Sequence, residues 1–132
     1  MTVFADTSAM LPFLDADDDD HEAVVTAWRE AVRGGARVVT SSYALVESVA
    51  LCQKRLGLEI TRNLLDKVAP AMEIVWVGPE IHEAAAATLL AANRRDLSLV
   101  DCASFEIMRR QGIRHAFTLD RHFEALGFER LP

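Results

Sequence analysis

The sequence predicts an α/β fold: one domain with a central parallel sheet of four to five strands flanked by helices. Three observations support this. The 132 residues are enough for a single domain with a buried core. A content of 51% hydrophobic and 26% charged residues is ordinary for a globular protein. Short apolar runs alternate with amphipathic stretches, which is typical of strands alternating with helices.

The first half of the chain predicts two strands and three helices. The apolar run at residues 3–5 is the first strand, and a helix over residues 7–14 follows it. Aspartates open the next helix, over residues 17–33, because acidic side chains suit the first turn of a helix. A glycine pair ends it. The second strand, residues 37–40, leads into a helix over residues 41–56 that a serine caps and a glycine ends.

The second half continues the alternation. The remaining helices are expected at residues 59–69, 79–92, 98–110 and 120–126, and the remaining strands at residues 73–77, 115–118 and 128–131. Pro79 and Ser98 mark two helix starts, since proline fits the first helical turn and serine caps it. Gly112 ends the helix that Ser98 begins. The pattern therefore continues without a linker to the end of the chain.

Two acids directly follow predicted strands. Asp6 comes after the first strand, and Asp120 comes after the strand at residues 115–118. Parallel α/β sheets bind ligands beyond the carboxyl ends of their strands, so both acids are expected at the functional edge of the sheet. Helix capping is the competing interpretation for each, because aspartate is common at helix starts.

Two further acids fall within apolar helix stripes, where a carboxylate is costly unless it is paired, protonated or metal-bound. The stripes are Tyr43, Val46, Ala50 and Leu51 around Glu47, and Leu97, Val100, Phe105 and Met108 around Asp101. Structural alternatives stay open. Asp101 also fits a capping box with Ser98, and Glu47 could pair with an arginine or reach water at the edge of its stripe.

The four acids together predict a metal centre. Asp6, Glu47, Asp101 and Asp120 include no histidine or cysteine, and such hard oxygen ligands prefer Mg²⁺ or Mn²⁺. Such a metal can orient a water, lower its pKa and stabilise an in-line phosphodiester displacement. Like charges in one pocket repel, so the pKa of at least one of these acids should be raised without metal.

Four segments carry a family resemblance, in matching order and spacing. They are FADTSAML at residues 4–11, SSYALVES at 41–48, DLSLVDCASFEIM at 96–108 and FTLDRHF at 117–123, with GFERL at 127–131 after them. Together they resemble a PIN domain, and more narrowly the VapC-type toxins of type II toxin–antitoxin systems. The resemblance spans the whole chain, residues 1–132. It implies a parallel sheet flanked by helices, a Mg²⁺- or Mn²⁺-dependent ribonuclease acting on RNA, a homodimer, and a small antitoxin that places a basic side chain near the acids.

The resemblance also assigns residues. The family's catalytic and metal-binding acids fall on Asp6, Glu47, Asp101 and Asp120, and its small hydroxyl residues fall on Thr7, Ser8 and Thr118. The hydroxyl residues are expected to orient the acids or to hold a water. Asp96 is an additional acid, interpreted as an outer partner of the site or as a helix cap.

The charge of the chain bears on whether it can bind RNA. The net charge is −6, but residues 94–132 carry 7 basic and 6 acidic side chains, a balance of +1. An acidic chain binds RNA poorly without cations or a structured substrate.

No apolar run suits a membrane span and the start lacks signal-peptide features, so a cytoplasmic location is expected. Cys52 and Cys102 are expected to be reduced and packed, and the four histidines to lie at the surface or in packing.

Two alternative functions remain. A receiver-like phosphoacceptor domain also has acids at strand ends, but it needs a lysine after its last strand, and Lys54 and Lys67 lie mid-chain on predicted helices. A catalytically inactive module could keep the PIN fold alone, although four intact acids argue against it. Incubation with mixed RNA and Mn²⁺ separates the three, because only the nuclease makes fragments.

Overall fold

Five parallel strands form the central sheet in the order β3-β2-β1-β4-β5. The computed structural model describes residues 1–132. The strands are β1 (Thr2–Ala5), β2 (Arg37–Ser41), β3 (Glu73–Val75), β4 (His115–Phe117) and β5 (Glu129–Leu131). The central strand is β1, whose Phe4 is in register with Val39 of β2 and Ala116 of β4. The predicted parallel sheet is confirmed, with all five strands present.

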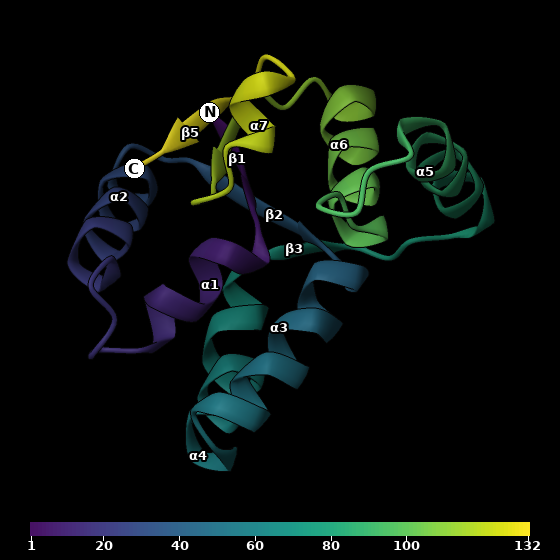
Figure 1. Cartoon of the computed structure of the whole chain (residues 1–132). Helices are drawn as coiled ribbons and strands as arrows, with labels where there is room; N and C mark the ends of the chain where they lie inside the picture. The colour runs from purple at the N-terminus through teal and green to yellow at the C-terminus, as the bar shows by residue number, and fades with distance from the viewer.

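Seven α-helices cover the two faces of this sheet. They are α1 (Thr7–Leu14), α2 (His21–Arg33), α3 (Ser42–Arg55), α4 (Leu58–Asn63), α5 (Pro79–Ala92), α6 (Leu99–Gln111) and α7 (His122–Ala125). Figure 1 shows α1 to α4 on one side of the strands and α5 to α7 on the other. None of them combines the length and the apolarity needed to cross a bilayer.

Two predicted helices differ from the structure. The helix expected over residues 17–33 begins at His21 as α2, after turns that include Asp17–Asp20. The helix expected over residues 59–69 ends as α4 at Asn63 and continues as a π-helical turn, Leu64–Val68, and a short 3₁₀ turn, Ala69–Ala71. Pro70 lies inside the last of these. Proline has no N–H to donate, and its ring clashes with the carbonyl four residues earlier in a regular α-helix. The wider π turn before Pro70 avoids that geometry.

The core is split into two layers by the sheet, because successive strand residues point to opposite faces. In β1, Val3 and Ala5 pack with α1, α2 and α3, whereas Phe4 packs with α6 and α7. The result is a three-layer α/β/α arrangement. The two cysteines are buried and unpaired, as predicted.

The position of the site follows from the strand order. The chain leaves β1 toward β2 on one side and later returns to β4 on the other, so the order reverses between β1 and β4. Their carboxyl ends lie side by side, with Ala5 in register with Phe117. Open α/β sheets bind ligands in the crevice at this reversal. The order also differs from the 2-1-3-4-5 order of receiver domains, which argues against that alternative.

Candidate metal centre

Asp6 lies at this edge of the sheet, directly after β1, as the N-cap of α1. It is only 3% exposed. Its Oδ2 accepts hydrogen bonds from Oγ of Ser8 at 2.6 Å, from Oγ1 of Thr118 at 2.9 Å and from the Ser8 amide at 3.4 Å. Its Oδ1 has no protein partner. Because no fully buried side-chain oxygen in the protein lacks a partner, Oδ1 of Asp6 is not fully buried.

The hydroxyls of Ser8 and Thr118 join the two strand ends. Oγ of Ser8 accepts from the Leu119 amide at 2.9 Å, and Oγ1 of Thr118 accepts from the Asp120 amide at 3.0 Å. They therefore hold the loop after β4 against Asp6. Thr7, expected to act in the same way, instead donates its hydroxyl to the Ala44 carbonyl at 3.2 Å. Thr7 thus fixes α3 against α1 and orients no acid.

Asp101 lies in the first turn of α6 and forms a capping box with Ser98. Its amide donates to Oγ of Ser98 at 3.0 Å, and its Oδ2 accepts from the Ser98 amide at 3.1 Å. Its Oδ1 makes no hydrogen bond. The capping box was the competing structural interpretation of this residue. Since it uses one carboxylate oxygen only, it leaves the other free to bind a cation.

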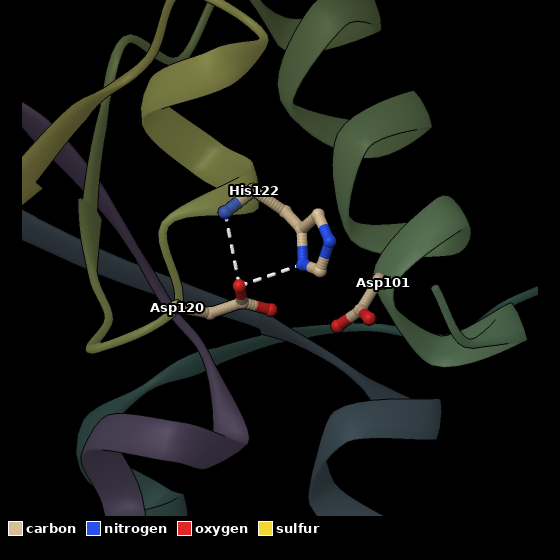
Figure 2. A group of neighbouring side chains, drawn as sticks. All are labelled: Asp101, Asp120 and His122. Carbon is tan, nitrogen blue, oxygen red and sulfur yellow. Dashed lines mark hydrogen bonds and ion pairs between the residues drawn. The ribbon is translucent and has the colours of Figure 1, made fainter. Parts of the chain in front are cut away.

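Asp120 follows β4 and shows the same division of its oxygens. Its Oδ1 accepts from the His122 amide at 2.9 Å and lies 2.7 Å from Nδ1 of the His122 ring, whereas its Oδ2 makes no hydrogen bond. Figure 2 shows the carboxylates of Asp120 and Asp101 pointing toward each other, with the imidazole beside them. One ligand atom from each of these three residues lies within 4.8 Å of the other two.

The carboxylates are poorly compensated electrostatically. The pKa of Asp6 is raised to about 6, because burial and, to a smaller extent, the charge of Asp101 outweigh the hydrogen bonds from Ser8 and Thr118. Burial also raises the pKa of Asp101, with a contribution from the charge of Asp120. The predicted rise is confirmed, although burial exceeds charge repulsion as its cause. No lysine or arginine forms an ion pair with Asp6, Asp101 or Asp120.

Glu47 is not joined to the other acids by any contact. It is half-buried on α3 and forms no hydrogen bond or ion pair. Like Asp6, it lies outside the group of ligand atoms within 4.8 Å, but Asp6 is close enough to Asp101 for that charge to raise its pKa. α3 does contact α6, and in Figure 2 it begins below Asp101. The assignment of Glu47 to the cluster stays a prediction.

The apolar stripe predicted around Glu47 is wrong, and the one predicted around Asp101 is confirmed only in part. In α3 the side chain of Val46 is 66% exposed and Ala50 is exposed as well. The buried residues of α3 are Ser42, Ala44, Leu45, Ser48 and Cys52. Small residues form this face because α3 packs closely on α1, where Oγ of Ser48 lies 3.4 Å from Oγ1 of Thr7. In α6, Phe105 and Met108 are buried as expected, but Leu97 precedes the helix.

The sequence interpretation missed His122. Its Nε2 lies 3.2 Å from Oδ2 of Asp96 and 3.3 Å from Nη2 of Arg94, and those two side chains form an ion pair at 2.8 Å. Asp96 is therefore an outer partner of the site and not a cap, since Ser98 caps α6. Burial lowers the pKa of His122, but the hydrogen bond to Asp96 and the charge of Asp120 outweigh it and raise the pKa overall. The sequence feature that could have indicated His122 is its position two residues after Asp120, at the start of α7.

These donors fit a hard divalent cation. Asp6, Asp101 and Asp120 come from three elements, and each has one oxygen held by hydrogen bonds and one left free. Carboxylates that are withdrawn from water are stabilised by pairing or by metal coordination, and the only basic side chain that pairs with any of these three is His122, which pairs with Asp120. Carboxylate oxygens are the ligands that Mg²⁺ and Mn²⁺ prefer.

Comparison with known proteins agrees with this fold. A model of the PIN domain matches residues 3–129, and the chain belongs to the PIN-domain family. Its relatives include VapC proteins of Mycobacterium tuberculosis. Ribonuclease VapC26 is 32% identical over 124 residues, covering 92% of this chain and 89% of that protein. The 23S rRNA-specific endonuclease VapC20 is 28% identical over 127 residues, covering 96% of this chain and 95% of that protein.

Solved structures of VapC proteins share the fold of this chain. The crystal structure of VapC20 from Mycobacterium tuberculosis, described as a Sarcin-Ricin loop cleaving toxin, matches with a TM-score of 0.87 and 29% identity, over 98% of this chain and 99% of that one. VapBC2 from Rickettsia felis matches with a TM-score of 0.73 at 12% identity, over 98% and 97% of the two chains. At that identity the second match supports the fold alone.

Proposed function

We propose that this protein is a divalent-metal-dependent endoribonuclease and the toxin of a toxin–antitoxin pair. The observation that carries the proposal is the shared pattern of Asp6, Asp101 and Asp120. Each carboxylate is fixed through one oxygen and free at the other, at the strand-order reversal of a PIN-domain sheet. Membership of the PIN-domain family supports the nuclease class.

Asp6, Asp101 and Asp120 would hold a Mg²⁺ or Mn²⁺ ion, with Glu47 as a fourth acid from α3. Such an ion supplies an oriented, acidified water and stabilises the charge that develops on a phosphodiester during hydrolysis. The hydrogen bonds from Ser8, Thr118 and the α6 cap set the carboxylate orientations before an ion binds. This preorganisation limits the rearrangement needed on binding.

RNA is the proposed substrate because the relatives are named as a ribonuclease and a 23S rRNA-specific endonuclease. The net charge of −6 disfavours non-specific attraction to a polyanion. A bound cation and a structured RNA would offset this deficit. The first substrates to test are therefore 23S rRNA and total RNA, compared with unstructured oligonucleotides.

Cleavage assays test the proposal directly. The purified protein should fragment RNA with Mn²⁺ or Mg²⁺ and stop when EDTA is added. Asp6→Asn and Asp101→Asn should lower the rate by at least about 100-fold, beyond the 10- to 100-fold typical of changes outside the ligand shell. Asp66→Asn is the matched control, because Asp66 is exposed and distant in sequence from every proposed ligand.

Cleavage that persists in EDTA would show a metal-free mechanism. Intact RNA under every metal condition, from a folded protein, would instead favour the inactive PIN-fold module.

The partners are proposed from the family. A small antitoxin is expected to place an arginine or lysine beside the acids, where it would replace the cation and satisfy the free oxygens. A homodimer and a cytoplasmic location are proposed on the same basis. Light scattering across a concentration series should give the mass of two chains; a monomer at high concentration would contradict the dimer.

A further inference from the structure

His122 contacts the candidate metal centre through both ring nitrogens and its backbone. Its amide and Nδ1 both face Oδ1 of Asp120, at 2.9 and 2.7 Å. On the other side of the ring, Nε2 faces Oδ2 of Asp96 at 3.2 Å and Nη2 of Arg94 at 3.3 Å. The ring is thus held between an acid of the centre and an ion pair on the loop before α6.

The partner of Nδ1 fixes where its proton lies. A carboxylate oxygen only accepts hydrogen bonds, so Nδ1 carries the hydrogen and donates to Oδ1 of Asp120. Together with the amide, this gives Oδ1 two donors. The second oxygen, Oδ2, receives none, and Figure 2 shows it directed toward Asp101.

We propose that His122 is a positioning residue of the metal centre, which holds Asp120 in the orientation that turns Oδ2 toward Asp101. The Arg94–Asp96 pair in turn holds the imidazole ring. The inference rests on the proposed function, because it presumes that Asp120 binds the cation. Side chains that orient a metal ligand in this way typically change metal affinity 10- to 100-fold when they are removed.

Direct ligation by His122 is the competing possibility, since one of its ring nitrogens lies within 4.8 Å of ligand atoms of Asp101 and Asp120. Ligation through Nδ1 would break its 2.7 Å hydrogen bond to Asp120. Ligation through Nε2 would break its contact with Asp96. The ring is already fully engaged, whereas each acid offers a free oxygen, so the hydrogen-bonding role uses the observed geometry without rearrangement.

Mn²⁺ titration followed by electron paramagnetic resonance of the free ion tests the proposal without relying on cleavage. His122→Ala and His122→Gln should weaken Mn²⁺ binding by roughly 10- to 100-fold. His122→Asn should lose less than about 10-fold, because its amide nitrogen takes the place of Nδ1 and still donates to Asp120. Comparing the Asn and Gln variants keeps the test valid even if the Ala variant is poorly folded.

His115→Ala is the matched control. The side chain of His115 is 26% exposed and pairs with Glu129, much as that of His122 is 21% exposed and pairs with acids. However, His115 opens β4 at the amino end of the sheet, away from the acids. Its loss should leave Mn²⁺ affinity unchanged.

Three results would overturn the proposal. They are wild-type affinity in His122→Gln, equal losses in the Asn and Gln variants, and a nitrogen hyperfine coupling showing direct Mn²⁺–imidazole ligation in the wild type. If the wild-type protein binds no Mn²⁺ at all, the proposed function fails along with the inference. If it binds Mn²⁺ and cleaves RNA while the His122 variants behave as wild type, only the inference fails.

Discussion

At the scale of single residues, Asp6 shows how burial and hydrogen bonding oppose each other. Its environment raises the pKa from 3.8 to about 6 because burial outweighs the hydrogen bonds of Ser8 and Thr118. A folded-state pKa above the unfolded value means that the folded protein binds the proton more tightly. The stability contributed by protonated Asp6 is therefore complete below about pH 4 and is lost as the pH rises through 6.

The raised pKa of Asp6 should make the stability of the metal-free protein depend on pH. Without metal, wild-type stability should fall by about 2–3 kcal/mol between pH 4 and 7 from Asp6 alone, at about 1.4 kcal/mol per pKa unit. Asp6→Asn removes that loss, because an amide keeps an acceptor for Ser8 and Thr118 but carries no charge. Urea unfolding in EDTA at several pH values measures it. Parallel stability curves for the two proteins would contradict the assigned pKa.

Sequence reasoning selected the site residues with uneven success at this scale. Asp6 and Asp120 were selected for a valid reason, since they follow neighbouring strands. Glu47 was predicted from an apolar stripe that α3 does not show, whereas the stripe around Asp101 is present in part, with Phe105 and Met108 buried. For Asp101 the family resemblance compensated, whereas Glu47 still lacks a contact. His122 was missed because its contact with Asp96, 26 residues earlier, joins parts of the chain that no local pattern relates, and the Asp120-x-His122 spacing is only a weak local signal.

At the scale of elements, α6 combines a structural and a functional task in its first turn. Ser98 and Asp101 satisfy each other's amides in a capping box, and the same box orients the Asp101 carboxylate. Start and stop signals of this kind made most helix boundaries predictable from sequence. The π turn after α4 was not, because Pro70 indicates a break in the helix without indicating its geometry.

Ser98→Ala provides the element-scale prediction. Losing the hydroxyl that accepts from the Asp101 amide should destabilise the protein by roughly 0.5–2 kcal/mol. Mn²⁺ affinity should fall by less than about tenfold, because the Ser98 amide still donates to Oδ2 of Asp101. Ser98→Thr keeps the hydroxyl and is the control. Chemical denaturation of the three proteins measures the effect, and an Ala variant as stable as wild type would show that the box contributes nothing.

At the scale of the whole molecule, strand order brings distant residues together. The pairing of β1 with β4 places Asp6 beside Thr118, 112 residues later in the chain. Alternating strands and helices predicted a parallel sheet, but not where its order reverses. A site at the carboxyl edge of the sheet could therefore be predicted from sequence. Its location between β1 and β4 required the structure.

A cation that joins three elements should stabilise the entire fold. Mn²⁺ at about 100 times its dissociation constant is expected to add about 2.7 kcal/mol to the free energy of unfolding by mass action. Asp6→Asn should gain much less, while Asp66→Asn should gain as much as wild type. Thermal melts with and without Mn²⁺ measure this. Equal gains in the wild type and Asp6→Asn would place the bound ion elsewhere.

The central claim is that Asp6, Asp101 and Asp120 hold one divalent cation through their free oxygens. Anomalous diffraction from a crystal soaked in Mn²⁺ tests it most directly, since manganese scatters anomalously and Mg²⁺ or water does not. The structure predicts a peak bonded to Oδ1 of Asp6, Oδ1 of Asp101 and Oδ2 of Asp120, at about 2.0–2.2 Å, the range usual for carboxylate ligands of small divalent ions. A crystal of protein that cleaves RNA with Mn²⁺ but shows its peak away from these oxygens would contradict it.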